Sequence, residues 1–322
     1  MSNSLLYFPY INVPNDSWTI KSILYWDKVG AIVPHIYKDN PDRLEKNMRA
    51  LVEAELVQQV FPYNYTYRIP NFDEAFIELT RQSDFNLQQK RIDFRNGLTS
   101  RLHVQKFGDR LLSELRRMGI ARKESWEWYH VESRTARLFM MYLATLIAKL
   151  DNFTPATDRA SNIDFSLQQK GLSSYIQTRR GKFLKDLMPY PIEPDIAKLK
   201  KFKNKYHKQL KAFRNNLEQT ILEVTAIRDR EQRERLYQLK LEEITAQKEE
   251  VYAKLNESKV GQVVFGTLFG LSGAGIGFVT GNSPLGLFGL GNAVYSAFQG
   301  YDRKGTLNSN FSYLALIDKK FG

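Results

Sequence analysis

A run of 42 residues, from Val260 to Tyr301, contains no Asp, Glu, Lys or Arg, and 11 of the chain's 19 glycines fall inside it. Its first part, Val260 to Gly281, has 22 residues. As an α-helix this part would extend roughly 33 Å, close to the ~30 Å hydrocarbon core of a bilayer. The second part, Leu285 to Gln299, has 15 residues, fewer than an upright crossing needs. The run therefore predicts an apolar, glycine-rich hairpin.

Two sets of glycines in this run have four-residue spacing, Gly266 with Gly270 and Gly273 with Gly277 and Gly281. On a helix this spacing places glycines on one face and lets two backbones approach closely. In water each glycine would cost a helix ~1 kcal/mol relative to alanine, so the hairpin needs an enclosing environment. Three interpretations remain open: insertion into a membrane, burial within protein, and a flexible glycine loop. The residues predicted to form the membrane hairpin are Gly266, Gly270, Gly273, Gly277, Gly281, Phe265, Phe269 and Phe278. Lys254 and Lys259 before the run, with Arg303 and Lys304 after it, favour a hairpin with both ends cytoplasmic.

The composition of the chain narrows its environment and its partners. With 322 residues and 43% hydrophobic content, the chain can bury a substantial core. It has no cysteine, which excludes disulfides and thiolate metal sites, and its first ten residues show no signal-peptide pattern. We expect a cytoplasmic location, peripheral to the inner membrane or inserted into it from the cytoplasmic side. The net charge of +12 favours anionic partners, either phosphates of nucleic acid or lipid headgroups.

Hydrophobic periodicity predicts an α+β protein that is predominantly helical, in three parts. Residues 1–188 form a mixed α/β head with a helical core, residues 189–258 a long helical hairpin arm, and residues 259–322 the glycine-rich hairpin and tail. The helix expected from Ser133 to Leu150 is apolar enough to be central core.

Several local predictions concern where elements end. Gly30 is expected to end the first helix, with a strand following from Ala31 to Tyr37. A helical stretch is expected from Asn71 to Met118, with a break around residues 96–100. Three prolines between residues 189 and 194 predict a hinge.

The main basic patch of the sequence lies between Ile196 and Leu217, where eight Lys or Arg occur and no acid. Apolar residues spaced by three or four predict coiled-coil-like helix there, with an αα-hairpin or one uninterrupted rod as the two arrangements. Four lysines share one helical face and are our candidates for binding an anionic surface: Lys198, Lys201, Lys205 and Lys208. The alternative is a solvated coiled-coil face.

Catalytic motifs are lacking. The sequence contains no phosphate-binding P-loop, no HExxH, no GxSxG and no CxxC. The weak catalytic candidates are His130, Glu132 and Asp158, near the two ends of the predicted central helix. We expect no metal and no cofactor, and the sequence favours a non-enzymatic protein.

The N-terminal residues carry a resemblance. Residues 6–11 (LYFPYI), Trp18, residues 24–30 (LYWDKVG) and residues 32–34 (IVP) resemble the start of an uncharacterised bacterial family that has only a domain-of-unknown-function label. Residues 142–144 and 154–158, the long charged helices and the glycine-rich tail are also similar to that family. The resemblance implies a bacterial or phage-related setting and assigns no mechanism.

Together these features predict a membrane-associating interaction or effector protein, in defence or stress response, whose basic arm contacts an anionic membrane surface. The alternative is a soluble nucleic-acid-binding or homo-oligomeric interaction protein that uses the lysine-rich helix and buries its glycine hairpin.

Overall fold

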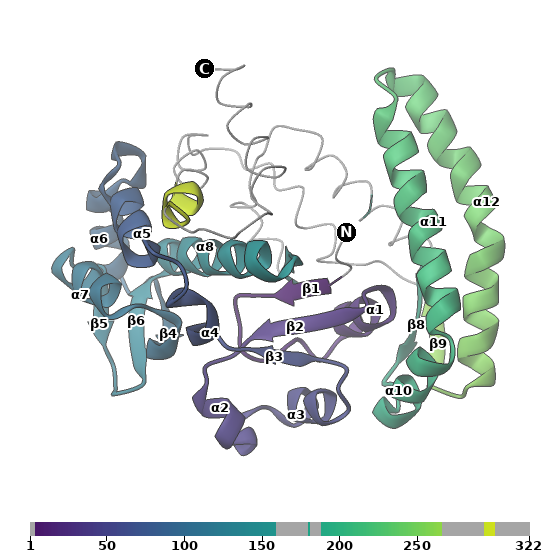
Figure 1. Ribbon diagram of the computed structural model, residues 1–322, viewed down its shortest axis with the longest axis horizontal. Coiled ribbons are helices and arrows are strands. Elements are labelled where there is room, and N and C mark those ends of the chain that lie inside the picture. The colour runs from purple at the N-terminus through teal and green to yellow at the C-terminus, as the bar shows by residue number, and fades with distance from the viewer. Residues whose placement is uncertain (1–3, 159–179, 181–187, 266–292, 300–322) are drawn as a thin grey trace.

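The computed structural model describes residues 4–158, 180, 188–265 and 293–299. Their elements confirm the predicted α+β class with predominant helix. Along the longest axis, a module with a small sheet lies at one end, a parallel sheet at the centre and a pair of long helices at the other end (Figure 1).

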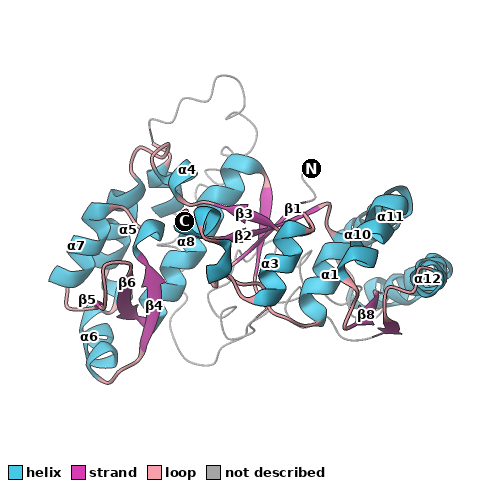
Figure 2. Ribbon diagram, turned by 90° about the horizontal axis from the view of Figure 1, so that it is seen from below, coloured by secondary structure: helices cyan, strands magenta, loops and turns pink. Residues whose placement is uncertain are grey.

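The central sheet is parallel and has the strand order β3-β2-β1-β7. Its strands are β1 (Ser4–Tyr7), β2 (Lys28–Ile32), β3 (Gln58–Val60) and β7 (Phe153–Ala156). The helices that connect the first three are α1 (Ser17–Tyr25), α2 (Ile36–Asp39), the 3₁₀ turn η1 (Pro41–Arg43) and α3 (Lys46–Glu53). Helices α1, α3 and α8 (Ser133–Asp151) cover the sheet (Figure 2).

The prediction that Gly30 ends the first helix is wrong. Helix α1 begins at the N-cap Asp16, whose carboxylate accepts a hydrogen bond from the Trp18 backbone N–H at 2.8 Å. It ends at Tyr25, because Trp26 is extended. Gly30 instead lies inside β2, where an added Cβ would come 2.9 Å from Cγ2 of Val60 on β3. Close packing between strands, and not a helix end, explains this glycine. The strand expected from Ala31 to Tyr37 likewise ends at Ile32 and gives way to α2.

The second sheet is antiparallel, with the order β4-β6-β5. It consists of β4 (Thr99–His103), β5 (Ala121–Lys123) and β6 (Trp128–Glu132). Around it lie α4 (Tyr63–Thr66), α5 (Phe72–Arg81), η2 (Ser83–Phe85), α6 (Leu87–Arg95), η3 (Val104–Lys106) and α7 (Asp109–Arg117). The predicted break around residues 96–100 is therefore the start of a strand, which the helical periodicity on either side concealed. We call α5–α7 with this sheet the sheet module.

Helix α8 (Ser133–Asp151) joins the two sheets and is buried along most of its length, as the sequence predicted. It follows β6 directly and leads into β7, so one helix fixes the sheet module against the parallel sheet. Buried residues form two clusters, one around α1 and the long helices and one around α5, α7 and α8.

The helical arm comprises α10 (Ile196–Lys205), α11 (His207–Ala226) and α12 (Arg230–Glu257). The chain turns at residues 227–229, so α11 and α12 are separate helices that lie side by side (Figure 1). The proline-rich segment is not a hinge: Pro189–Ile192 forms strand β8, which pairs with β9 (Gln262–Phe265). A two-stranded sheet has only edge strands, and these tolerate proline.

Candidate nucleic-acid interface

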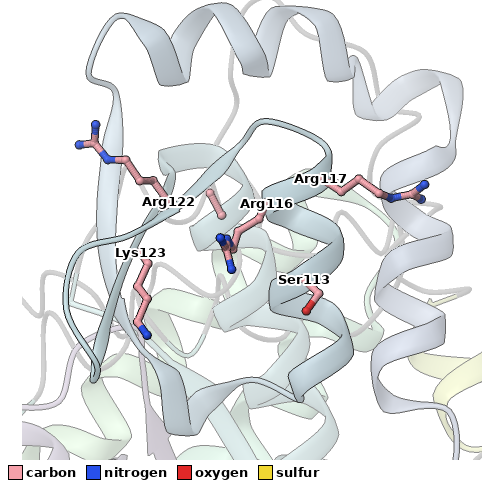
Figure 3. A pocket seen from close by; sticks show the side chains of 6 residues that line it. Ser113, Arg116, Arg117, Arg122 and Lys123 are labelled. Atoms are coloured by element: carbon pink, nitrogen blue, oxygen red, sulfur yellow. The ribbon is translucent and has the colours of Figure 1, made fainter.

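A basic hollow of about 590 Å³ lies between the end of α7 and strand β5. We use the name basic hollow for the site formed by its lining residues, Ser113, Arg116, Arg117, Ala121, Arg122 and Lys123. Four of these six carry positive charge and none carries negative charge. In Figure 3, Arg116 lies between the helix and the strand, whereas Arg117 extends along the far side of α7.

The end of α7 explains how these cations come together. The chain leaves the helix through Gly119, which has a left-handed backbone with φ of +75°. The Gly119 N–H donates to the Arg116 carbonyl and the Ile120 N–H to the Leu115 carbonyl, the two bonds of a Schellman motif. The reversal sends β5 back beside the last turn of α7. Residues 116–117 and 122–123, close in sequence, thereby face one space.

The charges of the basic hollow are mostly uncompensated. Arg117 pairs with Glu114 of its own helix at 2.6 Å. Arg116, Arg122 and Lys123 are exposed and form no ion pair within the described part of the chain. Cations held near one another without carboxylates favour the approach of an anion.

The outer face of the neighbouring sheet continues this positive surface. Arg101 on β4 and Arg122 on β5 lie in register on either side of His130 on β6. One acid lies among them: Glu124 accepts a hydrogen bond from Arg101 Nε at 2.7 Å and lies 3.6 Å from His130 Nε2. The Arg101 guanidinium also stacks over the Trp128 ring, 4.6 Å from its centroid.

An exposed tryptophan lies in the hairpin turn of this sheet. Trp126, in the turn between β5 and β6, is 69% exposed. The turn around it is fixed, since the Ser125 hydroxyl oxygen accepts from the Glu127 and Trp128 backbone N–H groups. The Glu127 side chain is buried and pairs with Arg43 at 2.6 Å. The indole is therefore presented to solvent by a rigid support.

The four predicted lysines of the arm do not share one continuous helix. Tyr206 has φ of −108° and ψ of 21°, which separates α10 from α11 and places Lys198, Lys201 and Lys205 on a different helix from Lys208. All four are exposed. Lys198 lies 3.7 Å from Asp195, and the Lys205 ammonium lies over the Tyr206 ring.

Two other cations of the same segment are structural. Arg214 is buried and donates to both carboxylate oxygens of Asp27, at 2.7 and 3.0 Å, and to the Tyr25 carbonyl. Lys203 Nζ donates to the Trp26 and Asp27 carbonyls. Cations at the carboxyl end of a helix complement its dipole, so these two attach the arm to the end of α1. The segment is thus only partly available as a binding surface.

The three weak catalytic candidates have other partners. Glu132 is 1% exposed and caps α8, accepting from the Arg134 and Thr135 backbone N–H groups at 2.8 Å. It also lies 3.6 Å from Lys90 Nζ. Asp158 follows β7 of the other sheet and accepts from the Tyr7 hydroxyl at 2.9 Å. The sequence cluster is therefore divided between a helix cap, the outer sheet face that holds His130, and the edge of the parallel sheet.

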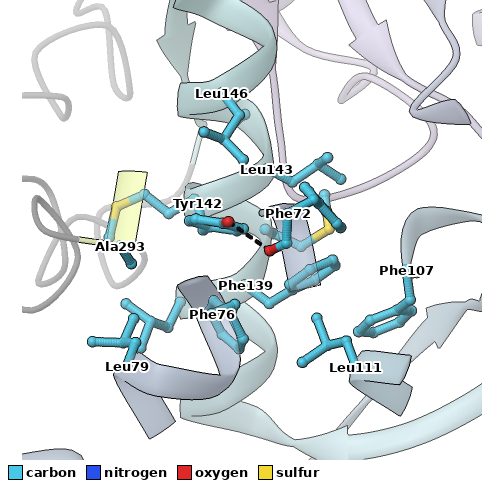
Figure 4. Packing of buried hydrophobic residues seen from close by; sticks show 14 of the residues in the cluster. Phe72, Phe76, Leu79, Phe107, Leu111, Phe139, Tyr142, Leu143, Leu146 and Ala293 are labelled. Atoms are coloured by element: carbon cyan, nitrogen blue, oxygen red, sulfur yellow. Dashed lines mark hydrogen bonds between the residues drawn. The ribbon is translucent and has the colours of Figure 1, made fainter. Parts of the chain in front are cut away.

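Both ends of the glycine-rich run are attached to the protein. Its first residues do not begin a helix: Val260 is buried and Gln262–Phe265 forms β9. Near the other end, residues 293–297 are helical, and Ala293, Val294, Ala297 and Phe298 join the buried cluster around Tyr142 (Figure 4). The predicted hairpin residues Gly266, Gly270, Gly273, Gly277, Gly281, Phe269 and Phe278 lie outside the described residues.

A hydrogen bond network secures the last described segment of this run, residues 293–299. Asn71, just before α5, donates its backbone N–H to the Ala297 carbonyl and its side-chain amide to the Ser296 and Gln299 carbonyls. Among the described residues, no helix combines the length and the apolar character needed to cross a membrane.

The sequence analysis did not single out the basic hollow, although residues 116–123 contain four cations and no acid. These eight residues were the part of the sequence from which the site could have been predicted. Comparisons with protein-family models, curated proteins and solved structures found no match to this chain. The resemblance of the N-terminal residues to an uncharacterised bacterial family therefore stays a prediction.

Proposed function

We propose that this protein binds nucleic acid through the basic hollow and the adjoining outer face of the β4-β6-β5 sheet. The observation that carries the proposal is a set of three exposed cations around one hollow, none of which has an ion-pair partner among the described residues: Arg116, Arg122 and Lys123. Arginine guanidinium groups suit phosphate because their planar donors match two phosphate oxygens.

The positive charge of the sheet module is concentrated in one stretch of the chain. Residues 87–128 contain ten Lys or Arg and five Asp or Glu, a formal net charge of +5, whereas the whole module, residues 72–132, contains eleven Lys or Arg and ten Asp or Glu. Phosphate contacts release condensed counterions, so this kind of binding weakens steeply as salt rises. A sequence-independent interaction with a polyanion is the function that this arrangement supports best.

The test is the salt dependence of the affinity for a fluorescein-labelled oligonucleotide, measured by fluorescence anisotropy between about 50 and 300 mM salt. The double variant Arg116→Gln/Arg122→Gln should bind more weakly by on the order of tenfold per arginine, and its log–log salt slope should fall by about 2. Both side chains are exposed, so thermal stability should change little.

A matched control removes the same charge elsewhere. Lys38 on α2 and Lys46 on α3 are exposed and lie outside the sheet module, so Lys38→Gln/Lys46→Gln should keep the wild-type slope. An undetectable wild-type affinity, or equal losses in the two double variants, would refute the proposal.

We propose membrane association as a second function, supported by the 42-residue uncharged run. The assay is flotation with anionic vesicles followed by carbonate extraction. It requires the full chain, because ending the chain at Ser258 would also remove β9 and the buried residues between 293 and 298. A full chain that does not float with the vesicles, even at low salt, would eliminate this second function.

A further inference from the structure

The β5-β6 hairpin of the β4-β6-β5 sheet carries an exposed aromatic ring in its turn and cations on its strands. Trp126 supplies the ring, and Arg101 and Arg122 lie in register on either side of His130. These two arginines are two strand spacings apart, about 10 Å between their backbones. Arg122 also lines the basic hollow, so one residue belongs to both surfaces.

We propose that this face selects single-stranded nucleic acid, with an unpaired base stacked on the Trp126 indole and the backbone phosphates held by Arg101 and Arg122. This inference rests on the proposed nucleic-acid function and adds the class of ligand. Stacking of bases on aromatic side chains, combined with a basic surface that follows the backbone, is the general means of binding single strands.

The exposure of Trp126 is the first argument for an unpaired base. A large ring that is 69% exposed gains no stability from its position, because apolar area in water is unfavourable. A base stacked on it would bury that area. In a duplex the base faces are already stacked on one another, and only the outer faces of the two terminal pairs are open, so a single strand offers the indole many more bases than a duplex of the same length.

The rigidity of the supporting turn is the second argument. The Glu124 and Ser125 backbone N–H groups both donate to the Trp128 carbonyl, and the Ser125 hydroxyl accepts two further backbone bonds. Glu127 is anchored to Arg43 on the inner side of the turn. A turn whose backbone is fixed before binding loses little backbone conformational entropy when a base stacks on its side chain.

The charge of the face supplies the third argument. Glu124 is shared between Arg101 and His130 and offsets one positive charge, whereas Arg122 has no carboxylate partner within the described residues. Arg101 is 53% exposed on its side chain and is oriented by its contact with Trp128. A phosphate that approaches this face therefore meets the oriented Arg101 guanidinium and the exposed Arg122.

The experiment compares a 15-nucleotide single-stranded thymidine oligomer with a blunt 15-base-pair duplex in the same anisotropy assay. Replacing Trp126 by Ala should weaken binding of the single strand by about tenfold or more, and binding of the duplex by less than twofold. Trp126→Phe, which keeps a smaller ring, should retain most of the single-strand affinity. Intrinsic tryptophan fluorescence should be quenched by the single strand in the wild type and much less in Trp126→Ala.

Tyr67 provides the matched control, since it is also 69% exposed, lies at the end of α4 and stacks near Tyr63. Tyr67→Ala should leave both affinities unchanged. Wild-type single-strand affinity in Trp126→Ala, with affinity lost in Arg116→Gln/Arg122→Gln, would overturn the single-strand inference and leave the proposed function standing.

Two further outcomes also decide the matter. Absence of binding to either oligonucleotide by the wild type would overturn both proposals. Binding of the wild type to anionic phosphatidylserine vesicles that Trp126→Ala abolishes, with oligonucleotide binding unaffected, would identify the face as a lipid contact and overturn the inference.

Discussion

The α7–β5 end of the sheet module and the helical arm both carry clustered positive charge, but they use it differently. In the arm, the innermost cations hold elements together. Arg214 binds the Asp27 carboxylate, and Lys203 binds the Trp26 and Asp27 carbonyls just after α1. In the module, Arg116 and Arg122 are exposed and have no acidic partner among the described residues. The arm thus contributes attachment, and the module contributes an open charged surface.

The density of charge along a sequence therefore does not by itself identify a binding site. The arm has the longer run of cations without an acid, and it drew the sequence prediction. Pairing and burial, which depend on segments about 180 residues apart in the chain, decide which cations remain available.

The largest expected effect tests the structural role of the arm cations. Arg214→Ala removes one hydrogen bond to the Tyr25 carbonyl and two to the Asp27 carboxylate. It should therefore lower the free energy of unfolding by about 2–3 kcal/mol. The exposed Arg116→Ala should change it by less than about 0.5 kcal/mol. Urea denaturation followed by circular dichroism measures both. Equal effects would abolish the distinction between attachment and surface charge.

A smaller effect, on the pH dependence of stability, is expected from two lysines that are removed from solvent to different degrees, one in each region. Lys106 of the module is 2% exposed and donates to the Pro9 carbonyl, and burial lowers its pKa to about 7. Burial lowers the pKa of Lys203 in the arm to about 8, although the Asp27 charge raises it in part. In the unfolded chain a lysine titrates near its ordinary pKa, at about 10.4.

The sign of the pH effect follows from these values. Between about pH 7 and pH 10 the unfolded chain binds more protons than the folded chain at Lys106, so stability should rise with pH in that window. Lys106→Met should flatten this rise and stabilise the protein by about 1–2 kcal/mol at pH 7. Urea denaturation at pH 7, 8 and 9 checks it, and an unchanged pH slope in the variant would contradict it.

The smallest expected effect concerns the exposed lysines of the arm. Lys201 and Lys208 form no ion pair within the described part of the chain, so Lys201→Gln/Lys208→Gln should change the free energy of unfolding by less than about 0.5 kcal/mol. A loss above 1 kcal/mol would show that these charges also attach the arm. The same denaturation assay applies.

Much of the fold was predictable where the signal is local. The apolar periodicity of α8 and the cap at Asp16 give elements that the structure contains. Strands β4 and β9 were missed because each is defined by a distant partner: β4 pairs with β6, and β9 with the proline-containing β8. Gly30 was misassigned for the same reason, since its role depends on Val60.

The candidate site was less predictable than the fold. Residues 116–123 show the four cations, but the Schellman turn at Gly119 is what brings them around one hollow. The register that aligns Arg101 and Arg122 is equally non-local. Glu132, a catalytic candidate by its position, is accounted for by the cap of α8.

The most direct test of the central claim sets the two regions side by side. The salt dependence of single-strand affinity should be measured for the wild type, Arg116→Gln/Arg122→Gln and Lys201→Gln/Lys208→Gln. The two variants each lose two positive charges and differ only in where those charges lie. We predict that the module variant lowers the log–log slope by about 2 and that the arm variant leaves it nearly unchanged. A slope reduced by the arm variant and retained by the module variant would contradict the account.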